Sequence, residues 1–186
     1  VVTLQIMSNA LRAVADEMEA ALVRAAYSPN ITERRDCSTA VFDPEGRMVV
    51  QSASIPVHLG AMPEAVAAVR RRDPRPGDIW AVNDPYRGGT HLPDITLISP
   101  VEIDGAVAAY AVTRAHHADI GGMSPGSMPS GSRELLQEGL VIPPIRLVRD
   151  GRPVEDVIAL LLANTRTPIE RGGDLRAQIA AHRLGE

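Results

Sequence analysis

The chain has 186 residues, a hydrophobic fraction of 45% and a formal net charge of −4, which suits one sizeable globular domain. It has no apolar run long enough for a transmembrane helix, and we expect no secretory signal. The mildly acidic charge, and the lack of aromatic residues among Arg70, Arg71, Arg72 and Arg75, argue against a nucleic-acid surface.

Two residue types restrict the chemistry further. All 19 basic residues are arginine, so Schiff-base lysines and the lysine of a phosphate-binding loop are excluded. The single cysteine, Cys37, rules out an internal disulfide and fits a reducing compartment. We therefore expect a cytoplasmic protein in which Cys37 is a small buried hydrophobe.

The first quarter of the chain predicts a helix and a hairpin. Apolar residues recur at three- and four-residue steps over residues 4–25, which predicts a long amphipathic helix whose stripe packs in a core or a subunit interface. Residues 37–42 and 47–51 have strand patterning on either side of the Asp43-Pro44-Glu45-Gly46 turn.

The middle of the chain predicts strands separated by a polar loop. Pro63 begins a short helix through residue 69, and residues 79–82 read as a buried strand. A polar, glycine-containing loop at 83–94 follows. Residues 95–99 and 107–113 then predict two strands joined by a turn with an Asp-Gly signal.

The last third of the chain predicts a loop followed by helices. Residues 118–132 are rich in Gly, Ser and Pro and predict a loop, and residues 140–148 are extended. Helices are expected at 154–162 and from Pro168 onward, with His182 exposed near the end of the second. The predicted class is α+β, a largely antiparallel β middle flanked by N-terminal and C-terminal helices.

The polar residues that carry chemistry gather in two segments, 83–94 and 114–122, each at the end of an apolar strand. Together these segments supply three imidazoles and three carboxylates, which suit Zn, Fe, Mn or Ni. His91 and Asp94 could place two ligands on one short turn. In an extended stretch His116 and His117 point to opposite faces, so one is expected to coordinate and the other to hydrogen-bond or face substrate.

Two pairs of glycines accompany these segments, Gly88-Gly89 and Gly121-Gly122. Glycine permits positive φ and the close approach of backbone to a ligand, and its N–H groups could bind an oxyanion or a phosphate. The alternative is unusual backbone geometry without a binding role. Asp84 and Asp119 also have a structural alternative, as a turn residue and a cap.

Three further side chains are candidates for contact with substrate. Arg87 and Arg114 lie in the polar segments and could form bidentate hydrogen bonds to a carboxylate or phosphate of the substrate, or ion pairs with neighbouring aspartates. His58, a lone histidine between apolar neighbours, indicates a core or turn residue, with substrate binding as the alternative.

Six blocks of the chain resemble the N-terminal blocks of hydantoinase B/oxoprolinase subunits, in matching order. They are residues 34–38 (RRDCS), 55–63 (IPVHLGAMP), 83–94 (NDPYRGGTHLPD), 114–122 (RAHHADIGG), 137–140 (QEGL) and 171–178 (RGGDLRAQ). The resemblance covers essentially the whole chain. It implies that residues 1–186 are the N-terminal portion of a longer subunit.

The resemblance also implies a function. Such subunits work with a hydantoinase A-like partner that binds ATP. They open cyclic amides such as hydantoins or 5-oxoproline, or carboxylate ketones such as acetone and acetophenone. The large subunit of the acetone enzyme holds a metal, so a divalent metal, Zn, Mn or Fe, is expected here. Carried over, the ligands are His91, Asp94 and His116, and the second-line candidates are Asp84, His117 and Asp119.

The leading hypothesis is ATP-dependent cyclic-amide hydrolysis. A metal would activate water, Asp119 or His117 would act as general base, and Arg114 with the glycine N–H groups would stabilise the oxyanion. The alternatives are a ketone carboxylase subunit and a non-catalytic scaffold fragment that docks a partner through its terminal helices. We expect an oligomer.

Overall fold

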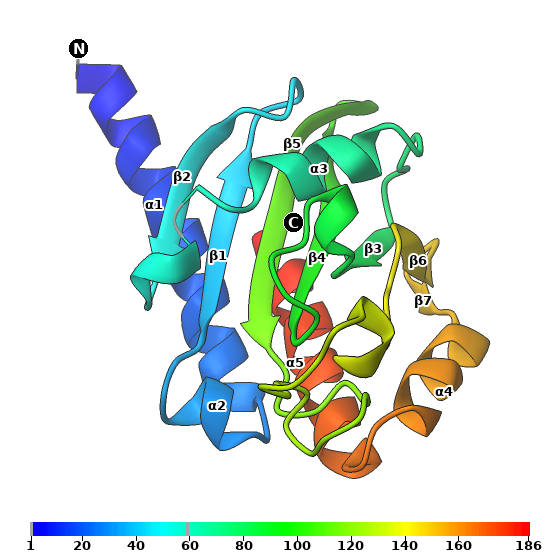
Figure 1. Ribbon diagram of the computed structural model, residues 1–186. Coiled ribbons are helices and arrows are strands. Elements are labelled where there is room, and N and C mark those ends of the chain that lie inside the picture. Colours follow the sequence, from blue (N-terminus) through cyan, green and yellow to red (C-terminus); the bar gives the residue numbers. More distant parts are fainter. Residues whose placement is uncertain (1, 59) are drawn as a thin grey trace.

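The computed structural model describes residues 2–58 and 60–186, which form an α+β fold and confirm the predicted class. One seven-stranded sheet runs in the order β2-β1-β5-β4-β3-β6-β7, and every neighbouring pair among the described residues is antiparallel (Figure 1). The strands are β1 (Cys37–Phe42), β2 (Met48–Ala53), β3 (Ile79–Val82), β4 (Asp94–Ile103), β5 (Ala106–His116), β6 (Ile145–Arg149) and β7 (Arg152–Pro153).

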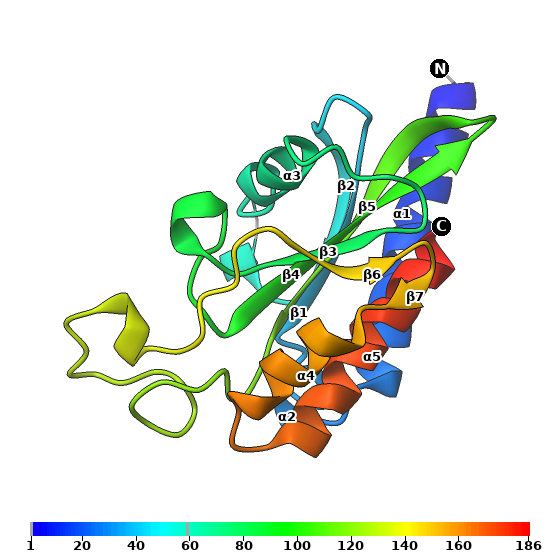
Figure 2. The same ribbon diagram turned by 90° about the vertical axis from the view of Figure 1, so that its right-hand side faces the viewer.

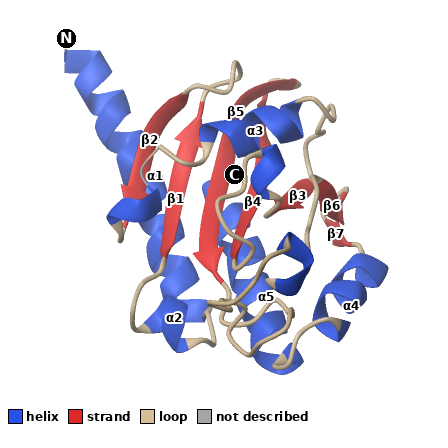
Figure 3. Ribbon diagram, in the orientation of Figure 1, coloured by secondary structure: helices blue, strands red, loops and turns tan. Residues whose placement is uncertain are grey.

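Helices cover both faces of this sheet (Figures 2 and 3). They are α1 (Val2–Ala25), α2 (Pro29–Thr32), α3 (Pro63–Arg70), α4 (Glu155–Ala163) and α5 (Pro168–Gly185), with short 3-10 turns η1 (Pro56–His58), η2 (Pro85–Arg87) and η3 (Leu135–Gln137). α3 packs on one face, whereas α1 and α5 lie side by side on the other.

Strand alternation divides the core between the two faces, because successive side chains of a strand point to opposite sides. On the α3 face, Val66 and Val69 pack against Phe42, Ile98 and Val112. On the opposite face, separate apolar clusters join α1 and α5 to the sheet, Met18 and Leu22 of α1 among them. Cys37 belongs to this second face and is fully buried, as expected.

The apolar stripe of α1 is buried in its second half, as expected for a core stripe, whereas Leu4 and Met7 are 73% and 57% exposed. For that first half, packing in a subunit interface stays a prediction. The expectation for the last helix is corrected. His182 is fully buried rather than exposed, because α5 lies across the sheet and its last turns cover β4 and β5. None of the described helices is long and apolar enough to cross a membrane.

Candidate metal centre

Antiparallel pairing brings three acidic or imidazole side chains to one end of the sheet. Asp94 opens β4 and is the register partner of His116, which ends β5. Asp36 immediately precedes β1, whose first residue Cys37 pairs with Ala115 of β5. The β4–β5 hairpin and the segment before β1 therefore place their polar side chains at the same end of the central strands, on the face that carries α3.

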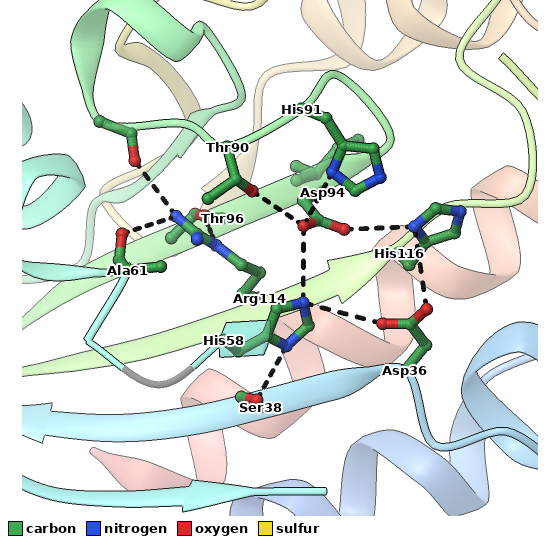
Figure 4. A network of polar contacts seen from close by, with 12 residues as sticks. Asp36, Ser38, His58, Ala61, Thr90, His91, Asp94, Thr96, Arg114 and His116 are labelled. Atoms are coloured by element: carbon green, nitrogen blue, oxygen red, sulfur yellow. Dashed lines mark hydrogen bonds and ion pairs between the residues drawn. The ribbon is translucent and has the colours of Figure 1, made fainter. Parts of the chain in front are cut away.

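Two connecting segments add imidazoles to this edge (Figure 4). His91 comes from the loop before β4, and its Nδ1 lies 3.0 Å from Oδ2 of Asp94. His58 ends η1, and its Nε2 lies 3.5 Å from Oδ2 of Asp94 and 3.7 Å from Oδ1 of Asp36. His116 Nδ1 lies 3.3 Å from Oδ1 of Asp94 and 3.9 Å from Oδ2 of Asp36.

These five side chains form two overlapping groups with the spacing of metal ligands. One atom each from His91, Asp94 and His116 lies within 4.8 Å of the others, and Asp36, His58 and Asp94 satisfy the same condition. Two atoms that face the shared space, His58 Nε2 and Asp94 Oδ1, are buried and make no hydrogen bond of good geometry, although each lies within ion-pair distance of another member of the cluster. Imidazole nitrogens and carboxylate oxygens are the donor atoms that bind a divalent cation. Buried polar atoms are rarely left without a hydrogen bond, so these two atoms could take part in binding one.

Asp94 is the centre of the network. Burial opposes its ionisation, but contacts from the imidazoles of His116, His58 and His91 outweigh burial, so the pKa of Asp94 lies well below its ordinary value. The same contact with Asp94 raises the pKa of His91. Thr90 Oγ1 donates to Oδ2 of Asp94 at 2.9 Å and fixes that carboxylate further. The carboxylate is therefore ionised and held in place at neutral pH.

The members of the cluster differ in their exposure to solvent. The side chains of His58 and Asp94 are 1% and 3% exposed, whereas those of Asp36 and His91 are 25% and 37% exposed. Asp36 and His91 are therefore the most accessible members of the cluster. The buried His58 is held by Ser38, whose Oγ lies 2.9 Å from His58 Nδ1.

Arg114 lies behind the cluster rather than at its opening. It is fully buried, and its Nε donates to Oγ1 of Thr96 at 2.8 Å. Its Nη2 donates to the carbonyl oxygens of Ala61 and Gly88, both at 3.2 Å, and Nη1 has no partner. Arg114 thus ties together the two loops that carry His58 and His91.

Two expected catalytic side chains are not brought to the cluster. His117 is buried on the opposite face, where Nε2 lies 2.9 Å from Oε1 of Gln178, and burial lowers its pKa to about 4. Asp119 pairs with Arg166 at 2.9 Å and accepts the N–H of Gly121. Burial opposes the ionisation of Asp119, but these hydrogen bonds prevail and lower its pKa.

The remaining candidates also have local partners. Asp84 caps η2 by accepting the N–H of Tyr86 and lies 3.3 Å from Arg87, so it belongs to the loop rather than to the cluster. A Cβ at Gly88 would lie 2.2 Å from the backbone nitrogen of Ala65, and one at Gly89 would lie 1.9 Å from a carbonyl oxygen. These glycines therefore allow backbone to approach backbone.

Gly121 and Gly122 have a comparable role in the loop that follows β5. Both have positive φ, and a Cβ on either would lie within 2.6 Å of another backbone oxygen. Their carbonyl oxygens accept hydrogen bonds from the guanidinium of Arg166. As with the first pair, the described contacts are made to the protein's own chain.

Two members of the cluster, Asp36 and His58, were not among the predicted ligands, and His58 was expected as a core or turn residue with substrate binding as the alternative. Asp36 was noted in the sequence only as part of the RRDCS block. It enters the cluster through the pairing of β1 with β5, which residue spacing along the chain does not reveal.

The comparisons with known proteins agree with this architecture. The model of the hydantoinase B/oxoprolinase family matches residues 1–186. The chain belongs to the hydantoinase B/oxoprolinase family. A 5-oxoprolinase of Dictyostelium discoideum is 36% identical over 187 residues, covering 99% of this chain and 15% of that protein. Caprolactamase subunit beta of Pseudomonas jessenii is 36% identical over 188 residues, covering 100% of this chain and 32% of that protein.

Two solved structures share the fold. The crystal structure of ATP-dependent caprolactamase from Pseudomonas jessenii matches with a TM-score of 0.91 and 34% identity, over 100% of this chain and 32% of that one. A nucleotide-free acetone carboxylase matches with a TM-score of 0.88 and 22% identity, over 97% of this chain and 25% of that one, which shows a common fold. This hydantoinase B-type chain spans about a third or less of the length of its curated relatives.

Proposed function

We propose that this chain carries the metal centre of an ATP-dependent cyclic-amide hydrolase and acts with a hydantoinase A-like subunit that binds ATP. One observation carries the proposal: five acidic and imidazole side chains converge, and two of their buried polar atoms make no hydrogen bond of good geometry within the protein. Family membership supports the reaction class, since relatives are named 5-oxoprolinase and caprolactamase.

The residues fit a divalent cation. His91, Asp94 and His116 would hold it, with Asp36 completing the set from the more exposed side. Imidazole nitrogen and carboxylate oxygen suit Zn, Mn or Fe, and the buried Cys37 faces the other side of the sheet. When bound, such a cation would supply Lewis acidity that polarises a carbonyl oxygen and activates water.

The other side chains of the site position these groups. Ser38 holds His58, whose Nε2 faces both carboxylates and would orient them by hydrogen bonding. Arg114 places a buried positive charge behind Asp94 and fixes the two flanking loops. Asp36 and His91 are the most exposed members of the cluster, so the substrate ring would approach from their side.

ATP is assigned to the partner. The chain has no lysine with which to build a phosphate-binding loop of the common type. The relatives named as subunit beta and as ATP-dependent caprolactamase support a division of labour between subunits. The partner would activate the ring with ATP, and this chain would hold the activated ring for attack by water.

The first test is metal content. We expect stoichiometric divalent metal by elemental analysis in the purified chain, and none in a His91→Ala, His116→Ala double variant whose circular dichroism is unchanged. His182→Leu is the matched control, because it removes a buried imidazole from the opposite face. A well-folded wild type without metal would contradict the proposed centre.

The second test is activity in the complete complex with its ATP-binding partner. We expect ATP-dependent ring opening without added carbon, abolished by His91→Ala. Wild-type turnover in that variant would refute a role for the site. Bicarbonate incorporation into a ketone, in place of ring opening, would show a carboxylase instead.

A further inference from the structure

A stripe of polar side chains on α5 is buried instead of exposed to solvent, on a helix that lies against the sheet (Figure 2). Arg171, Asp174, Gln178 and His182 follow one another at helical spacing and are all essentially buried. Polar stripes on helices normally face water, and a buried polar group needs a hydrogen-bond partner. The partners of this stripe therefore show what α5 holds in place.

Gln178 has partners on two strand ends. Its Nε2 donates to the carbonyl oxygen of Ile95 at 3.1 Å and to Oγ1 of Thr113 at 3.2 Å. A carbonyl oxygen only accepts, so the amide orientation is fixed and Oε1 faces His117 Nε2 at 2.9 Å. His117 must therefore carry its proton on Nε2.

Two of the three partners of Gln178 adjoin residues of the metal centre. Ile95 follows Asp94, and His117 follows His116. The backbone N–H of His117 also donates to the carbonyl oxygen of Pro93 at 2.8 Å. The carbonyl groups on either side of Asp94 are thus held by the backbone of His117 and by the side chain of Gln178, and the latter approaches from the face opposite to the cluster.

We propose that Gln178 and His117 form a buried brace that sets the positions of Asp94 and His116, so that α5 acts as a positioning element of the metal centre. The effect on affinity rests on the proposed metal site. Residues that orient metal ligands typically change affinity about 10- to 100-fold when they are removed. His182, one turn further along, shares Thr113 with Gln178 but has Ser99, rather than Ile95 or His117, as its other partner, and it serves as the matched control.

The test compares Gln178→Met with His182→Leu in this chain. Both variants replace a buried polar side chain of α5 with an apolar one of similar size, and both should lower the thermal midpoint. We expect Zn(II) affinity, measured by chelator competition, to fall at least about tenfold in Gln178→Met and to stay unchanged in His182→Leu. Equal affinity in wild type and both variants would overturn the brace.

A metal-free measurement separates this proposal from the metal centre itself. NMR of the imidazole rings should show shifted His91 and His116 signals in metal-free Gln178→Met but not in His182→Leu. If the wild type binds no Zn(II), the proposed centre fails while this comparison still decides the brace. If Gln178→Met does not fold, the wild-type tautomer of His117 decides, because a proton on Nδ1 instead of Nε2 overturns the brace.

Discussion

The buried imidazole of His182 predicts a specific loss of stability in acid. Burial lowers its pKa from the ordinary value of 6.5 to about 3, because the charged ring would lie between α5 and the sheet without a carboxylate partner. The unfolded chain takes up a proton below pH 6.5, whereas the folded chain does not until about pH 3. The stability that His182 contributes is therefore complete above pH 6.5 and declines as pH falls toward 3.

The size of this loss follows from linkage. Each pH unit below the unfolded pKa costs about 1.4 kcal/mol per group that stays neutral only in the folded state. From pH 6.5 to pH 5 the loss is about 2 kcal/mol, a large part of the roughly 5–15 kcal/mol that stabilises a typical domain.

Urea unfolding of wild type and His182→Leu, in chelator-containing buffer near neutral pH and near pH 5, measures this loss. The variant should be less stable at neutral pH, because it removes the hydrogen bonds between His182 and the hydroxyls of Ser99 and Thr113, at a total cost of about 1–3 kcal/mol, while Thr113 keeps its bond from Gln178. The difference between the two proteins should narrow by about 2 kcal/mol at pH 5, since the other titrating groups are common to both. A difference that stays constant with pH would refute the buried neutral state of His182.

Three further predictions concern other parts of the fold. Burial, with the charges of Glu19 and Asp36 nearby, raises the pKa of Cys37 to about 12. Iodoacetamide should therefore label Cys37 only in unfolded protein, and rapid labelling of the native chain would contradict the prediction. Gly89→Ala should abolish soluble folded protein, whereas Gly131→Ala, which meets nothing within 4 Å, should be tolerated in the same expression assay. Arg166→Gln removes the ion pair with Asp119 and should lower the free energy of unfolding by about 1 kcal/mol, since Arg166 is partly exposed. Limited proteolysis of residues 118–138 should become faster in this variant, and an unchanged digestion rate would contradict the prediction.

The local part of the candidate site was predictable from the sequence. His91 and Asp94 lie on one short turn, and His116 ends the strand that pairs with the strand beginning at Asp94. Strand patterning and a turn signal are enough to place this hairpin. Asp36 and His58 were not predicted as part of the cluster, because they reach it through the pairing of β1 with β5 and the position of η1.

The C-terminal helix shows why other features could not be predicted. A stripe of arginine, aspartate, glutamine and histidine normally indicates the solvent side of a helix, and His182 was expected to be exposed because it lies near the end of the helix. The sheet surface under α5 carries the hydroxyls of Ser99 and Thr113, which satisfy such a stripe. Composition alone does not show that the two polar surfaces meet.

The strand order has a consequence for how the centre assembles during folding. Asp94 and His116 lie on neighbouring strands of one hairpin, which forms through local contacts, whereas Asp36 arrives only when β1 docks against β5 across a long stretch of chain. A chain in which β1 has not yet paired with β5 would therefore offer the proposed cation an incomplete set of donors. Tight binding of that cation would require this pairing, so that metal binding and completion of the sheet would be coupled.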